Sequence, residues 1–99
     1  MKIYEVLQPT KLPCAYSHFK KKQTPPFLVY IGTGQDDLAA DNTYYHKNNR
    51  YRVEYYFTVK DEEKEAAIES ALLAAGFLYE KSDDIYIESE DVFVIYYDV

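Results

Sequence analysis

Cys14 and His18 are the residues of this sequence that come nearest to a nucleophile and its base. A thiol is activated only when the imidazole lies within hydrogen-bond reach. In an extended strand, a spacing of four residues puts both side chains on one face but about 13 Å apart, which is too far for proton transfer. No pattern brings His46 to Cys14 instead. Because a free cysteine is most often a packed residue, we expect no catalytic group and no enzyme.

Oxygen ligands gather at Asp36, Asp37, Asp41 and Asn42. These residue types bind calcium, but here they lack the regular spacing and the terminal glutamate of a calcium-binding loop. Two histidines are too few for a zinc site, which takes four ligands, or three and a water. We therefore predict a solvated, charged loop that holds no metal and no cofactor.

Gly32-Thr33-Gly34 follows an apolar run, as a phosphate-binding loop follows a strand. No Gly-Lys-Ser or Gly-Lys-Thr comes after it, and the aspartates that do would repel phosphate. Lys20, Lys21 and Lys22 form the one basic run of the sequence. Adjacent lysines at a strand end are usually just solvated. The functional alternative is a docking contact with an acidic partner.

The composition limits the classes of function. Ninety-nine residues suffice for one core and one domain, residues 1–99. A net charge of −6, from 11 basic and 17 acidic residues, repels a phosphate backbone, so we expect no sequence-specific nucleic-acid partner. The sequence has no apolar run of membrane-spanning length, so we expect a cytoplasmic protein with no membrane partner. Twelve tyrosines suit protein interfaces, although tyrosine is also simply a good strand former.

Strands and one main helix must position these residues. Apolar runs predict buried strands at 27–31 and 92–99, and alternation predicts a half-buried strand at 51–59. Shorter strand patterns cover 14–19, 77–81 and 85–89.

The main helix is predicted over about 61–75, from a cap at Asp61 to a left-handed stop at Gly76. A short N-terminal helix is expected to end at Pro9. The fold class is therefore α+β, a mostly antiparallel four- to five-stranded sheet with both helices packed on one face.

Residues 32–42 are rich in Gly, Asp and Ala and predict a flexible loop, because connections of this length are uncommon in small domains unless they function or move. A strand arm is expected at 43–47. Asn48 and Asn49 are then expected to form a turn, since asparagine tolerates the left-handed conformation.

Several stretches resemble a family of small proteins from the tail-assembly region of long-tailed phages and prophages of Gram-positive bacteria. They are LPCAYSHF, PPFLVYI, LAADN with YHKNNRYRVEYY, KDEEKEAAIESAL, and FLYEK with IYIESED. The resemblance runs from Leu12 to the C-terminus. It implies a tail terminator, or tail-completion protein, that caps the tail tube as a ring, usually of six copies, and provides the head-docking surface. The implied partners are other copies, the major tail tube protein and the head-tail connector protein. The implied locations are the cytoplasm of the bacterial host during assembly and the virion tail.

In such a ring, the loop is a candidate assembly interface that orders against a neighbouring subunit or the tube, with Leu38 as a possible apolar anchor. The candidate interface residues are Gly34, Gln35, Asp36, Asp37, Leu38, Asp41 and Asn42. Three other readings stay open at this point. They are another head-tail joining component, an acidic binding module that acts on a host protein, and a small enzyme that uses Cys14 or a histidine.

Overall fold

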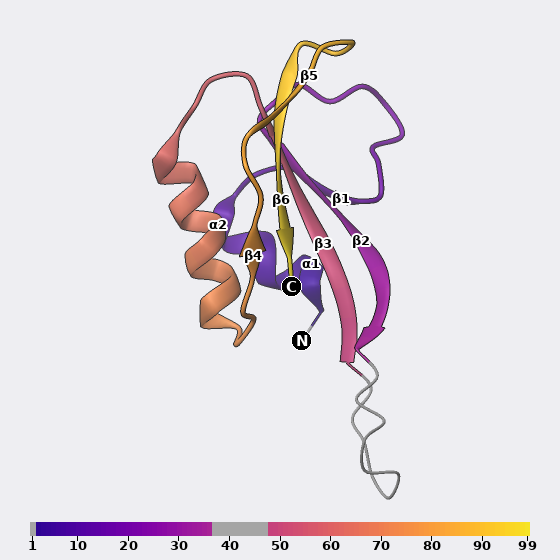
Figure 1. Cartoon of the computed structure of the whole chain (residues 1–99), viewed down its shortest axis with the longest axis vertical. Helices are drawn as coiled ribbons and strands as arrows, with labels where there is room; N and C mark the ends of the chain where they lie inside the picture. The colour runs from indigo at the N-terminus through magenta and orange to yellow at the C-terminus, as the bar shows by residue number, and fades with distance from the viewer. Residues whose placement is uncertain (1, 37–47) are drawn as a thin grey trace, which may run out of the picture.

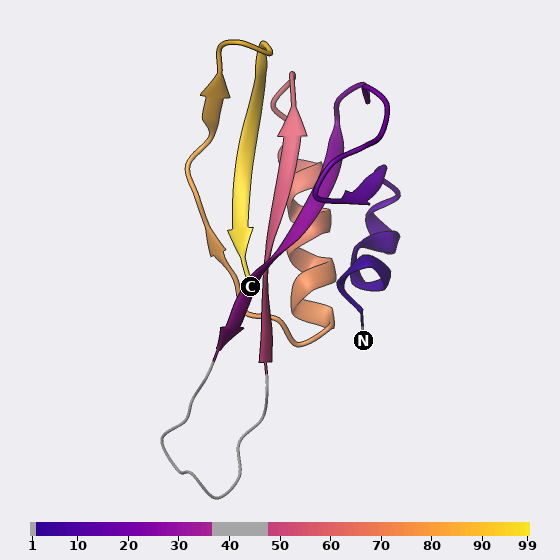
Figure 2. The same cartoon turned by 90° about the vertical axis from the view of Figure 1, so that its right-hand side faces the viewer.

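Six strands form one mixed sheet in the computed structural model, which describes residues 2–36 and 48–99 (Figures 1 and 2). The strands are β1 (Cys14–Tyr16), β2 (Phe27–Asp36), β3 (Asn48–Phe57), β4 (Glu80–Lys81), β5 (Ile85–Ile87) and β6 (Val92–Asp98). Their order is β1-β2-β3-β6-β4, and β5 also pairs with β6. The pair β1–β2 is parallel and the other pairs are antiparallel. The α+β class is confirmed, with six strands instead of the four or five predicted.

Two helices and a 3-10 turn pack on one face of this sheet: α1 (Ile3–Leu7), the turn Gln8–Thr10, and α2 (Glu62–Ala74). Asp61 caps α2 as predicted, because its carboxylate accepts hydrogen bonds from the amides of Glu63 and Lys64. Gly76, with φ +87°, ends the helix in the left-handed conformation that glycine favours. The predicted helix bounds of 61–75 are therefore confirmed to within one residue.

The core lies between the helices and the sheet. Alternate residues of β3 point into it, Val53, Tyr55 and Phe57, and this confirms the half-buried pattern read from the sequence as far as Phe57. The predicted end at residue 59 is wrong, because β3 ends at Phe57 and Val59 is 75% exposed. Ile68 and Leu72 of α2 cover them. The remaining buried members of the core are Ile3, Val6, Leu7, Leu28, Ile95 and Tyr97.

The loop predicted over 32–42 is wrong in its first half. Residues 32–36 continue β2 as a ladder against β3, in which Gly34 pairs with Arg50 and Asp36 pairs with Asn48. A bulge between Gly32 and Gly34 breaks the register, and Gly34 accommodates it with φ +107°. Asn48 and Asn49 accordingly belong to β3 and not to a turn. Residues 37–42 and the strand arm predicted at 43–47 lie outside the described residues.

The first predicted strand is shorter than the sequence suggested. β1 ends at Tyr16 because Ser17 takes a φ of +66°, which directs the chain out of the sheet. Residues 17–26 then form a loop before β2 begins. In the part of the chain that the structure describes, no helix is both long and apolar enough to cross a membrane.

Candidate functional site

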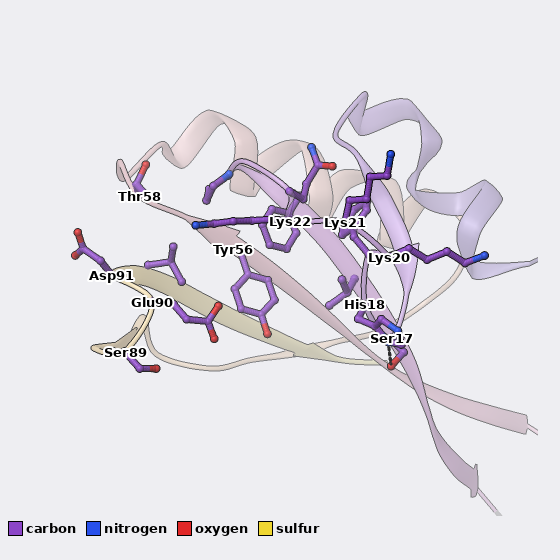
Figure 3. A pocket seen from close by; sticks show the side chains of 16 residues that line it. Ser17, His18, Lys20, Lys21, Lys22, Tyr56, Thr58, Ser89, Glu90 and Asp91 are labelled. Atoms are coloured by element: carbon purple, nitrogen blue, oxygen red, sulfur yellow. Dashed lines mark hydrogen bonds between the residues drawn. The ribbon is translucent and has the colours of Figure 1, made fainter.

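A cavity of about 650 Å³ lies on the face of the sheet that carries no helix (Figure 3). Its floor is apolar: Phe27 and Val29 of β2, Tyr56 of β3 and Val92 of β6 line it. The Phe27 and Tyr56 rings stack with their centroids 5.0 Å apart. The sheet therefore offers an aromatic surface on the side opposite the core.

One wall of the cavity is the lysine loop, which we define as residues 17–26. Phe19 anchors it, because its ring packs edge-on against Phe27 with centroids 5.3 Å apart. The predicted docking run, Lys20, Lys21 and Lys22, follows directly and lines the cavity with exposed side chains (Figure 3). None of the three lysines forms an ion pair with another described residue.

The opposite wall is formed by Ser89, Glu90 and Asp91 of the acidic turn, which we define as residues 88–91 between β5 and β6. Its shape is fixed locally: the amide of Asp91 donates to the carbonyl of Ile87 at 2.9 Å, and the Asp91 carboxylate accepts from the Tyr86 hydroxyl at 2.7 Å. Glu88 and Glu90 are exposed. The cavity thus lies between a basic wall and an acidic wall.

The Tyr56 hydroxyl, the polar group of the cavity floor, already has a hydrogen-bond partner. The Tyr56 hydroxyl donates to Glu54 Oε1 at 2.7 Å. Burial and this hydrogen bond raise the pKa of Tyr56, so its hydroxyl stays protonated at neutral pH. The arrangement supports contact with a partner surface more readily than proton transfer.

Cys14 and His18 do not come together. Cys14 pairs with Leu28 in register and packs against the core on the helix side of the sheet, whereas His18 lines the cavity on the other side. The expectation that both lie on one strand face is therefore wrong, because β1 ends between them. Burial raises the pKa of the Cys14 thiol to about 11, so it is not a thiolate at neutral pH.

The other sequence motifs are placed only in part. Gly32, Gly34, Gln35 and Asp36 lie in β2, so the Gly-Thr-Gly motif is strand, not a phosphate-binding turn. Asp37, Leu38, Asp41 and Asn42 lie outside the described residues. Within residues 2–36 and 48–99, no group of three or more His, Cys, Asp or Glu side chains could hold a metal ion.

A buried charge network was missed at the sequence level. Glu65 of α2 is only 3% exposed, yet its carboxylate lies 2.8 Å from the Lys60 ammonium and 3.0 Å from the Lys81 ammonium. Lys81 also pairs with Glu69 at 2.8 Å, and Glu69 accepts a hydrogen bond from the Tyr97 hydroxyl. The only sequence signal was a glutamate one turn before Ile68, on the apolar stripe of the helix.

Apolar side chains are exposed at both edges of the sheet. Tyr4 and Tyr16 stand at the β1 edge, where both rings pack against Tyr30. A different set stands at the β4–β5 edge, namely Leu78, Ile85 and Tyr86. Leu78 is 84% exposed and Tyr16 is 56% exposed. Both edges thus expose apolar side chains that could bind another protein, but the two sets of side chains differ.

Comparisons of this chain with protein-family models, with curated proteins and with solved structures found no match.

Proposed function

We propose that this chain is a structural assembly protein of a phage tail, a tail terminator that caps the tail tube as a ring and presents the surface to which the head docks. The proposal starts from the resemblance of residues 12–99 to such proteins, together with the α+β fold that the resemblance implies. Its partners are other copies of the chain, the major tail tube protein and the head-tail connector protein. It acts in the host cytoplasm during assembly and stays in the virion tail.

The observation that carries the proposal is the pair of unlike apolar edges. A ring requires a heterologous interface, in which one patch of each subunit meets a different patch of the next. The β1 edge offers tyrosine rings, and the opposite edge offers aliphatic and aromatic side chains around Leu78. Joining these edges would bury side chains that water now surrounds, which favours association.

The shortness of the two edge strands also fits association into a closed ring. β1 has three residues, and β4 has two, so neither of these edge strands supplies a long unpaired backbone ladder of its own. Association through side chains is therefore expected to dominate over strand addition, and this lowers the risk of open-ended aggregation.

The test is electron microscopy of particles made by the parent phage or prophage with this gene deleted, beside particles made when the gene is restored. A terminator predicts DNA-filled heads and separate tails of irregular or excessive length. Separate tails of normal length would instead indicate a head-tail joining component. Normal virions from the deletion strain would overturn the tail assignment.

Restoring the gene with single substitutions tests the edges directly. Leu78→Asp and Tyr16→Asp each place a charge on one proposed interface, so each should reproduce the deletion phenotype although the protein folds. Val59→Asp is the matched control, because Val59 is 75% exposed but lies between β3 and α2, away from both edges. Normal virions from both edge variants would contradict the edge-to-edge ring.

A further inference from the structure

The lysine loop and the acidic turn lie at the same end of the molecule (Figure 2). The last residues of β2 and the first residues of β3 lie at the opposite end. They flank one cavity, with the aromatic floor between them (Figure 3). A basic wall, an apolar centre and an acidic wall therefore follow one another across a single surface.

The lysines of the basic wall differ from other lysines of the chain in their ion pairing. Lys60, Lys64 and Lys81 are all held in ion pairs with carboxylates. The lysines of the loop have no such partner among the described residues, although the chain as a whole carries a net charge of −6. Phe19 nevertheless holds their loop over the sheet.

The acidic wall is similarly placed for an outside contact. The side-chain carboxylates of Glu88 and Glu90 accept no hydrogen bond and form no ion pair within the described residues, and both residues are exposed. Asp91 differs, because its carboxylate is bound to Tyr86 and fixes the turn. Each wall thus presents exposed charges that have no ion-pair partner among residues 2–36 and 48–99.

We propose that two copies of the chain pair through this surface, each placing its acidic turn against the lysine loop of the other. A two-fold interface must be self-complementary, so that if residue i contacts residue j, then j contacts i. A surface with one wall of each sign meets this requirement. The aromatic floor supplies apolar contact at the centre, and the exposed charges supply direction.

A second copy fits this surface better than a polyanion does. A nucleic acid or a uniformly acidic peptide would gain the three lysines but would be repelled by Glu90 and Asp91 on the facing wall. In a two-fold pair, the acidic turn of a second copy would meet the lysines while its own lysine loop meets the first copy's acidic turn. Because the charges are exposed, the pairing should weaken about tenfold between low and high salt.

Charge reversal with complementation tests the pairing. Wild-type protein should show a concentration-dependent mass approaching twice 11.6 kDa in analytical ultracentrifugation at low salt. K21E/K22E and E88K/E90K should each be monomeric, because each sets like charges opposite each other twice. Mixed in equal amounts, the two variants should pair, since every contact then joins opposite charges. Asp91 is left unchanged so that the turn keeps its shape.

Matched controls carry the same charge changes elsewhere. K2E/K11E and E80K/D83K alter exposed residues that do not line the cavity, and they should leave the wild-type mass unchanged. Circular dichroism and thermal unfolding of each variant establish that it is folded. A wild type that stays monomeric, a mixture that stays monomeric, or a mixture that forms assemblies larger than two would each overturn the proposal.

This inference does not rest on the tail assignment. The solution mass reports the pairing of isolated protein, and micrographs of phage particles report the tail function. Either one can fail while the other stands.

Discussion

Glu65 Oε1 lies 3.0 Å from the Nζ atom of Lys81, and this contact joins the buried face of α2 to the edge strand β4. The carboxylate is almost fully buried, whereas the lysine keeps about a third of its side chain in water. A buried charge is tolerated only when it is paired, so the edge strand stays in place partly because the helix requires its lysine.

Removing that lysine charge should therefore destabilise the fold. Lys81→Met keeps the aliphatic stem but leaves Glu65 with Lys60 as its one cation. We expect the free energy of unfolding in urea to fall by about 1–3 kcal/mol. Lys11→Met, at an exposed position outside this network, should change it by less than about 0.5 kcal/mol. Equal effects of the two substitutions would show that the network adds no stability.

Replacing Tyr97 or Tyr55 by phenylalanine should have different effects on the free energy of unfolding. The Tyr97 hydroxyl donates to Glu69 Oε2 at 2.8 Å, whereas the buried Tyr55 hydroxyl has no hydrogen-bond partner among the described residues. Burial raises the pKa of Tyr55 to about 12, so its proton stays in place.

Tyr97→Phe should consequently lower the free energy of unfolding by about 1 kcal/mol, because it removes a hydrogen bond to a charged group. Tyr55→Phe should leave it unchanged or raise it by up to about 1 kcal/mol, because it removes an unpaired buried hydroxyl. Chemical denaturation of both variants beside the wild type measures the difference. A larger loss for Tyr55→Phe than for Tyr97→Phe would contradict these assigned contacts.

The decrease in the free energy of unfolding at acid pH should depend on Glu69. Burial by itself would raise the pKa of this carboxyl, but hydrogen bonds from Lys81 and Tyr97 outweigh it and lower the pKa below the ordinary 4.5. A depressed pKa in the folded state stabilises the fold above the unfolded-state pKa, and that contribution is lost as the pH falls through the folded-state pKa.

Glu69→Gln should then lower the free energy of unfolding most above about pH 5. The difference in this free energy between variant and wild type should narrow as the pH falls below about 4. Urea unfolding at a series of pH values from 7 to 3 measures it. Glu80→Gln, at an exposed position of β4, is the control and should show no such narrowing. A gap for Glu69→Gln that stays constant down to pH 3 would refute the assigned role of this carboxylate.

The bulge in β2 makes a prediction about two glycines. Gly34 has a φ of +107°, which a side chain strains, whereas a Cβ at Gly32 would only come within 3.8 Å of the Tyr16 hydroxyl. Gly34→Ala should lower the free energy of unfolding by about 1–3 kcal/mol. Gly32→Ala should be tolerated within about 0.5 kcal/mol. If thermal and urea unfolding show equal losses, the bulge is placed wrongly.

The sequence by itself determined the parts of this fold that depend on short-range patterns. Alternation assigned Val53, Tyr55 and Phe57 to one face of β3, and Asp61 and Gly76 marked the ends of α2, because pleat and helix caps are properties of neighbouring residues. The same patterns gave the α+β class.

Only the tertiary structure decided what distant segments do to one another. Gly32 to Asp36 read as loop because their composition is that of a loop, but pairing with residues 48–51 makes them strand. Glu65 was assigned no role from the sequence, and only the fold brings Lys60 and Lys81 to its carboxylate. Lys20 to Lys22 read as a solvated run, and the acidic turn opposite them is nearly seventy residues away in sequence. Such contacts join groups far apart along the chain, so no local pattern encodes them.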